Sequence, residues 1–260
     1  MLTVVTSLYP LAQAVSEVGG SQVRVIDLAR SGVDPATMPV DPQERREIQG
    51  ASLVVDIGDG FQPAVESAAT GARRTLALLP ALGGTNPYIW LDPVLMEKAA
   101  PLIGNALSRA EPAARSVFAT GAEDLESEAS SLDIDFQNSF AVCPDTTFVT
   151  SNDAFARMAA RYGLTDHAVG TTSQPDAREV RAASSAITAS RTGTAFSEPY
   201  VNDVLISAAA QAAGAKEAAL STLETPPPSG SRAEVSYSNQ MENDLHTLTD
   251  ALQCPTDTGN

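Results

Sequence analysis

Two histidines, His167 and His246, are the side chains of this sequence best suited to acid–base chemistry near neutral pH. Neither stands near a nucleophile in a recognisable elbow motif, and the sequence contains no HExxH or HxxH pair. The segment Gly58–Gly60 lacks the third glycine of a dinucleotide-binding loop, and no P-loop is present. We interpret both histidines as surface residues. The sequence therefore predicts that the chain is not an enzyme.

The two cysteines, Cys143 and Cys254, are too few for a disulfide scaffold and too far apart for a CxxC metal pair. They are able to form one bridge, and two isolated buried thiols are the alternative. We favour the bridge because an oxidising compartment is expected on grounds given below.

The net charge of the chain excludes several partners. Its 260 residues carry 16 Lys and Arg against 32 Asp and Glu, a net charge of −16. This balance argues against binding to nucleic acid, which depends on cationic side chains, and against anchoring on an anionic membrane surface. No apolar run approaches the roughly 20 residues of a membrane span. Met1–Thr3 leads directly into strand-like valines, so we expect no signal segment in this chain.

The elements that must position any site alternate between strand and helix in the first half. Asp41–Glu44 has the pattern of a helix start, with a capping side chain, a proline at the first helical position and a glutamate three residues after the cap. Ser52–Ile57 is a nearly continuous apolar run, which is typical of a parallel strand buried on both faces. The predicted elements are strands over Leu2–Thr6, Val23–Val25, Ser52–Ile57 and Leu76–Leu79, and helices around Leu11–Val18 and from Asp41 to Gly50.

The middle of the chain has helical spacing only, and the alternation then resumes. Pro101 is expected to kink or break the first middle helix. The predicted elements are helices over Pro93–Arg109 and from Pro112 to about Ser131, a strand over Thr146–Thr150, a helix from Asn152 to Tyr162, a strand over Ala195–Glu198, a helix to about Ala213, a strand over Glu217–Leu220, a loop over Pro226–Ser231, and a helix over about Gln240–Leu252.

This order predicts an α/β fold of two lobes, each with a mostly parallel sheet, joined by a long bridging helix. We expect an N-terminal α/β lobe over residues 1–110, the linking helix over 111–140 and a C-terminal α/β lobe over 141–260. A cleft between two such lobes is a common place for a small ligand.

Four segments at predicted strand ends or loops are the most informative part of the sequence. They are Gly32–Thr37 (GVDPAT), Asn86–Pro93 (NPYIWLDP), Phe148–Phe155 (FVTSNDAF) and Phe196–Pro199 (FSEP). In this order they resemble the metal-binding solute receptors of zinc and manganese ABC importers. The first strand, VVTSLYPLAQAV, and the ending, MENDLHTLTDAL, are also similar to that family, so the resemblance extends from about residue 2 to 253.

The resemblance implies an extracytoplasmic binding protein that holds one divalent transition metal between its lobes and delivers it to a membrane permease. The family's ligand positions, usually His or carboxylate, fall here on Ala36, Tyr88, Asn152 and Ser221. None of these side chains is an imidazole, a thiolate or a carboxylate, the donors that zinc prefers. The histidine-rich loop of many zinc-specific members is also missing. We therefore expect no transition-metal cofactor and no bound metal of the family kind.

The polar residues at the family's ligand positions also have structural interpretations. Asn152 has the residue type of a helix N-cap, Tyr88 can fill the space of an imidazole and metal, and Ser221 can be an ordinary loop residue. Glu198 and Asp153 are the supporting carboxylates at the expected cleft, where a structural hydrogen bond and a favourable contact with a helix dipole are the alternatives.

Our main interpretation is therefore a solute receptor with a degenerate metal site, which acts on another small-molecule ligand or through protein contacts. The alternative is a genuine zinc or manganese transport receptor with rearranged ligands such as Glu198 or Asp153. The expected partner is a membrane ABC permease or another transport protein, and we expect a monomer outside the cytoplasm, in the periplasm or attached to the cell surface.

Overall fold

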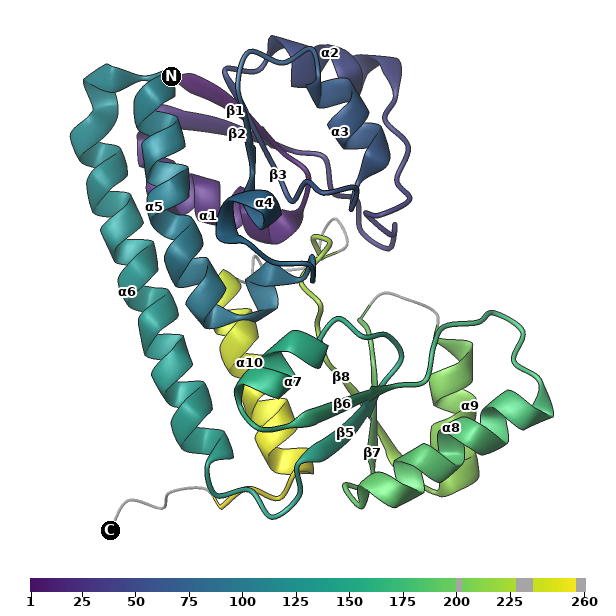
Figure 1. The fold of residues 1–260 in the computed structure, drawn as a ribbon. Helices are drawn as coiled ribbons and strands as arrows, with labels where there is room; N and C mark the ends of the chain where they lie inside the picture. Colours follow the sequence, from purple (N-terminus) through teal and green to yellow (C-terminus); the bar gives the residue numbers. More distant parts are fainter. Residues whose placement is uncertain (200–202, 228–235, 256–260) are drawn as a thin grey trace. The chain divides into compact units, whose positions relative to one another are not determined.

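The computed structural model describes residues 1–199, 203–227 and 236–255. The chain forms two compact units, each built around its own parallel sheet (Figure 1). Unit 1 comprises Met1–Ser131 and Leu223–Ser238, and unit 2 comprises Leu132–Thr222 and Asn239–Asn260. This division differs from the expected one because the chain returns to unit 1 after the last strand of unit 2. The predicted fold of two α/β lobes joined by a long helix is confirmed.

Unit 1 contains a four-stranded parallel sheet in the order β2-β1-β3-β4. Its central strands are apolar, and all four residues of β3 are buried, because helices cover both faces of a parallel sheet. The elements are β1 (Leu2–Thr6), α1 (Tyr9–Gly19), the 3₁₀ turn η1 (Gly20–Gln22), β2 (Val23–Asp27), α2 (Pro42–Gly50), β3 (Leu53–Asp56), α3 (Pro63–Ala69), β4 (Thr75–Ala77), α4 (Leu78–Leu82), η2 (Ile89–Leu91), α5 (Pro93–Ala110) and η3 (Pro112–Ala114).

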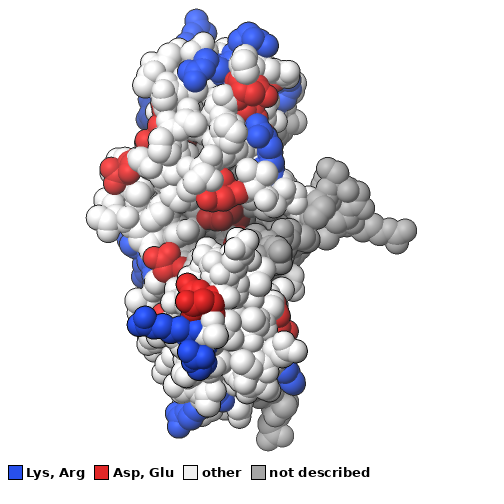
Figure 2. Space-filling view, turned by 90° about the vertical axis from the view of Figure 1, so that its right-hand side faces the viewer, with Lys and Arg blue, Asp and Glu red and all other residues white. Residues whose placement is uncertain are grey.

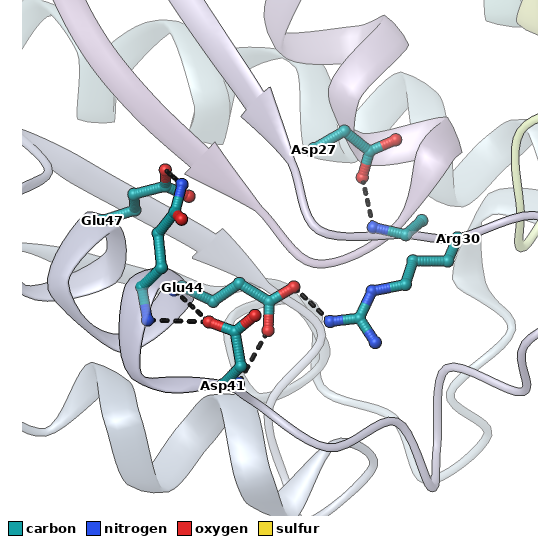
Figure 3. Close-up of polar contacts among 7 residues, drawn as sticks. Asp27, Arg30, Asp41, Glu44 and Glu47 are labelled. Carbon is teal, nitrogen blue, oxygen red and sulfur yellow. Dashed lines mark hydrogen bonds and ion pairs between the residues drawn. The ribbon is translucent and has the colours of Figure 1, made fainter.

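The start of α2 shows how local sequence places a helix (Figure 3). Asp41 Oδ1 accepts hydrogen bonds from the backbone N–H groups of Gln43 at 2.7 Å and Glu44 at 2.8 Å. Glu44 Oε2 accepts one from the backbone N–H of Asp41 at 2.8 Å, and the other Glu44 oxygen pairs with Arg30. The predicted helix start is therefore a complete capping box.

Unit 2 repeats the architecture with the strand order β6-β5-β7-β8, again all parallel. Helices α8 and α9 bury an apolar cluster against Val149 of β5 and Ala195 of β7. The elements are β5 (Thr147–Thr150), α7 (Ala156–Arg161), β6 (Thr165–Ala168), α8 (Ala177–Ser190), β7 (Thr194–Ser197), α9 (Val204–Ala213) and β8 (Lys216–Ala219); α6 (Arg115–Phe140) and α10 (Tyr237–Ala251) have residues in both units.

Several elements differ from the sequence prediction. Helix α5 continues through Pro101, since a proline removes only one backbone hydrogen bond and the helix is held by its packing on α1. The apolar run Leu76–Leu79 divides into the end of β4 and the start of α4, because a short buried run does not distinguish strand from helix. The sequence analysis also missed α3, β6 and α8.

A disulfide joins Cys143, just after α6, to Cys254, just after α10. The sequence left this pairing open, and the structure places both sulfurs in one bridge within unit 2. Of the helices described, none combines the length and the apolar character that crossing a membrane requires. On the face drawn in Figure 2, acidic and basic side chains form small separate clusters, and no broad basic surface is present there.

Candidate functional site

In unit 1, two of the four candidate positions lie on loops: Ala36 after strand β2, and Tyr88 between helix α4 and the 3₁₀ turn η2. Ala36 lies in the loop after β2, where Asp34 Oδ1 accepts a hydrogen bond from its backbone N–H at 2.9 Å. Asp34 Oδ2 also accepts a bond from the Thr37 hydroxyl at 3.1 Å. Asp34 therefore shapes this turn, and Ala36 itself has no side-chain atom that binds a ligand.

Tyr88 belongs to an aromatic cluster in unit 1. Its ring centre lies 5.4 Å from that of Trp90 and 6.0 Å from that of Phe61, both in edge-on geometry. Trp90 is fully buried, and the backbone N–H of Tyr88 donates to Asn86 Oδ1 at 2.9 Å. The Tyr88 ring thus packs against other aromatic rings.

In unit 2, the candidates Asn152 and Glu198 come together, and Glu198 directly follows β7. Asn152 Nδ2 donates to Glu198 Oε2 at 3.3 Å, and the Thr222 hydroxyl donates to Glu198 Oε1. These groups line a cavity of about 10 Å³, the volume of roughly one water molecule. Since β5, β7 and β8 are neighbouring parallel strands, their carboxyl ends place all three side chains at one edge of the sheet. The sequence analysis missed Thr222, because a loop hydroxyl has no distinguishing signal.

Asn152 is not the N-cap that the sequence predicted. Helix α7 begins at Ala156, and the side-chain oxygen of Asn152 accepts a hydrogen bond from the backbone N–H of Ala154 at 3.0 Å. This is an Asx turn, a local alternative to capping that uses the same side-chain oxygen. The turn leaves the amide nitrogen of Asn152 directed at Glu198.

Two buried carboxyl groups support this edge of unit 2. Asp244, on α10, accepts a hydrogen bond from the backbone N–H of Ser221 at 3.1 Å, and burial raises its pKa to about 7 although that bond opposes the shift. Asp166 lies 2.6 Å from the Thr150 hydroxyl. Burial raises the pKa of Asp166 to about 7; the Thr150 bond opposes this shift and the charge of Asp153 adds to it.

The remaining candidates lie outside this group. Asp153 is exposed beside Asn152, and His167 and His246 are exposed on β6 and α10. Ser221 directly follows Leu220 after β8 and is tied to Asp244 through its backbone. In the described part of the chain, no three His, Cys, Asp or Glu side chains gather as a metal-binding group.

Comparison with known proteins identifies relatives over nearly the whole chain. The profile of the family described as "Zinc-uptake complex component A periplasmic" matches residues 4–251. The high-affinity zinc uptake system protein ZnuA of Paracoccus denitrificans is 26% identical over 255 residues, which cover 79% of this chain and 78% of that protein. The zinc-binding protein AdcA of Streptococcus pyogenes serotype M1 is 24% identical, and the match covers 94% of this chain but 55% of AdcA. The chain thus spans about half the length of AdcA.

Solved structures show the same fold. The Zn(II)-bound ZnuA-like domain of Streptococcus pneumoniae AdcA superposes with a TM-score of 0.84, covering 96% of this chain and 98% of that one, at 22% identity. These comparisons confirm the predicted receptor family and the expectation that the chain is not an enzyme.

The relatives contradict the expectation that no transition metal is bound, because their names state zinc uptake, zinc binding or bound Zn(II). The prediction was wrong because it equated the loss of imidazole and carboxylate at four positions with the loss of binding. Glu198 lies outside those four positions and supplies a carboxylate at the same sheet edge as Asn152.

Proposed function

Because the chain belongs to the family of periplasmic zinc-uptake component A proteins, we propose that it is the receptor of an ABC importer and that zinc is its cargo. The family relationship and the zinc-binding relatives support this proposal. The observation that carries it on this chain is the carboxylate of Glu198, held at the carboxyl edge of the unit 2 sheet by two donors.

Glu198 is the metal ligand in this proposal, and Asn152 and Thr222 position it. Asn152 directs its amide N–H₂ group at the carboxylate, and an N–H donor has no lone pair for a metal. The Thr222 hydroxyl donates to the other carboxylate oxygen. Each carboxylate oxygen has two lone pairs, so accepting a hydrogen bond does not by itself prevent a carboxylate from binding a cation. Asp153, one residue beyond Asn152, is the second carboxylate that we include.

An oxygen-rich ligand set also bears on the choice of metal. Carboxylate and water ligands suit manganese as well as zinc, whereas imidazole and thiolate favour zinc. At one site, divalent zinc nevertheless binds more tightly than manganese in the usual affinity order. We therefore expect zinc to be preferred over manganese, with a smaller preference than a histidine-rich site would give.

The disulfide and the family description support a location outside the cytoplasm. Disulfides persist in oxidising compartments, and the family is described as periplasmic. In this proposal the chain passes its zinc to a membrane permease.

The test is zinc titration of the full chain by calorimetry, with stoichiometry from native mass spectrometry. We expect one zinc per chain, and Glu198→Gln should weaken binding at least about tenfold, because it removes the charge but keeps the size of the side chain. The matched control is Glu217→Gln, which changes an exposed glutamate on the neighbouring strand β8 and should leave the affinity unchanged. Asp153→Asn tests the second carboxylate in the same way.

Two results would overturn parts of this proposal separately. If the wild-type chain binds no stoichiometric zinc, the cargo assignment is wrong. If zinc binds and Glu198→Gln retains the wild-type affinity, the cargo stands and Glu198 is not the ligand.

A further inference from the structure

Unit 1 buries a group of polar side-chain atoms without partners at the carboxyl end of its sheet. Among the described residues, Ser7 Oγ, Asp56 Oδ1 and Gln62 Oε1 have no hydrogen-bond partner. The three residues are only 0%, 2% and 1% exposed. Burying such an atom without a partner is costly, so three together need an explanation.

Strand pairing and one hydrogen bond bring these residues to the same end of the sheet. Val5 of β1 pairs with Val54 of β3, and both belong to the apolar cluster under α2 and α3. Thr6 of β1 pairs with Val55 of β3, so Ser7, directly after β1, and Asp56, the last residue of β3, take the next positions at the carboxyl end of these two strands. Gln62 directly precedes α3, and its Nε2 lies 3.1 Å from the backbone oxygen of Ser7.

The hydrogen bonds of Gln62 determine which end of its amide faces inward. Its Nε2 donates to the backbone oxygens of Ser7 at 3.1 Å and Pro35 at 3.2 Å. Only the N–H₂ end is able to donate to two carbonyl oxygens, so the unpartnered end of the amide is its oxygen. Gln62 Oε1 and Asp56 Oδ1 are both acceptors, and two acceptors do not satisfy each other. The missing partner is therefore a proton donor or a cation.

The charges around this group favour a cation. Glu66 is close enough to Asp56 to repel it, and Glu66 accepts bonds from the backbone N–H groups of Gly60 and Gln62 at 3.0 Å each. Burial, followed by the charge of Glu66, raises the pKa of Asp56 to about 7. Neither of the ion pairs recorded among the described residues involves Asp56. A buried carboxylate without a cationic partner is costly when ionised, and a bound cation removes that cost.

We propose that Ser7, Asp56 and Gln62 form a binding site for a sodium ion inside unit 1. Hydroxyl, carboxylate and amide oxygens are the ligands of hard cations, and a single carboxylate balances a single positive charge. The site also contacts the loop that carries the candidate position Ala36, because Gln62 Nε2 donates to the backbone oxygen of the preceding residue, Pro35. This proposal does not depend on the identity of the cargo.

The experiment compares sodium with choline at constant ionic strength, using the full disulfide-bonded chain at about pH 8, where Asp56 is mostly ionised. The thermal midpoint should rise with sodium. Above the dissociation constant, each tenfold increase in free sodium corresponds to about 1.4 kcal/mol for one site. Sodium NMR line widths should show a bound population that chelators of divalent metals do not remove. The sodium effect should shrink at about pH 6, because protons then compete at Asp56.

Asp56→Asn should abolish both signals. Asp27→Asn is the matched control, since Asp27 also ends a strand of this sheet and burial raises its pKa to about 7. Its Oδ1, however, accepts a bond from the backbone N–H of Ala29 at 3.0 Å, so the sodium response should remain. Gln62→Glu adds a second carboxylate and should shift the preference from sodium to calcium.

The proposal fails if the wild-type midpoint is the same in sodium and choline and the NMR signal shows no bound sodium. It also fails if Asp56→Asn keeps the full sodium response. If Asp56→Asn does not fold, the wild-type comparison and the NMR measurement still decide. If Gln62→Glu is destabilised and its thermal midpoint responds to neither sodium nor calcium, the partner of these oxygens is a buried water or a proton, and the proposal of a cation site is wrong.

Discussion

Gly121 is the position where one added methyl group should disturb unit 1 most clearly. A Cβ added to this residue of α6 would lie 2.5 Å from the backbone oxygen of Val18 in α1, 2.8 Å from the Val18 Cα and 2.9 Å from its carbonyl carbon. All three are backbone atoms, so no flexible side chain is able to move aside. Carbon–oxygen contacts normally begin near 3.3 Å, so Gly121→Ala requires the two helices to separate locally by about 0.8 Å.

Two effects oppose each other in this substitution. An alanine in place of a glycine inside an unobstructed helix stabilises it by about 1 kcal/mol. Overpacking a close contact costs about 1–3 kcal/mol, and backbone contacts of this length belong at the upper end of that range. We expect Gly121→Ala to lower the free energy of unfolding by about 1–2 kcal/mol, measured by urea denaturation with an unchanged m-value.

The control for this prediction is Gly50→Ala. Gly50 is the last residue of α2, and a Cβ there would meet no atom within 4 Å, so this substitution should be neutral or slightly stabilising. Our interpretation of the contact between α1 and α6 is refuted if Gly121→Ala is as stable as the wild type or as Gly50→Ala.

Two further predictions concern unit 2. Replacing Cys143 and Cys254 together by serine should lower the free energy of unfolding by up to about 5 kcal/mol, because the bridge spans 111 residues; a loss below about 1 kcal/mol in denaturant titration would contradict this. Asp244 has a pKa of about 7 in the folded chain and near 4 in the unfolded chain. Between about pH 4 and 7 the folded chain therefore holds a proton on Asp244 that the unfolded chain has lost. Its contribution to stability is therefore present at low pH and is lost as pH rises towards 7, by at most about 1.4 kcal/mol per pH unit. Asp27, Asp56 and Asp166 have similarly raised pKa values and contribute slopes of their own, so Asp244→Asn should make the slope between about pH 4 and 7 shallower by the share of one group. A slope unchanged from the wild type in unfolding measurements would argue against the assignment.

Strands buried on both faces could be predicted from sequence, because a short continuous apolar run such as Leu53–Val55, set between turn residues, is typical of a central parallel strand. Strand β6 was missed because it is an edge strand whose four residues are mostly exposed and polar. Helix α8 had a usable signal in Asp176 and Glu179, which form a capping box like that of α2. Its alanine- and serine-rich sequence has few large apolar residues to reveal the helical period.

The candidate site was harder to predict than the fold. Asn152 illustrates why: an N-cap and an Asx turn both use the side-chain oxygen to accept a nearby backbone N–H, so the residue type alone does not separate them. The grouping of Asn152, Glu198 and Thr222 depends on the spatial order of three strands, which sequence order does not give. The two unpartnered acceptor atoms, Asp56 Oδ1 and Gln62 Oε1, were likewise not predictable, because their position depends on strand register and burial.

The bridge between Cys143 and Cys254 makes a closed covalent ring of everything between them. All four strands of unit 2 lie inside that ring, as does the segment Leu223–Ser238 that returns to unit 1. A protease that cuts once within the ring therefore releases no fragment until a reductant opens the bridge. On a denaturing gel, a singly nicked chain should migrate as one species without reductant and as two with it.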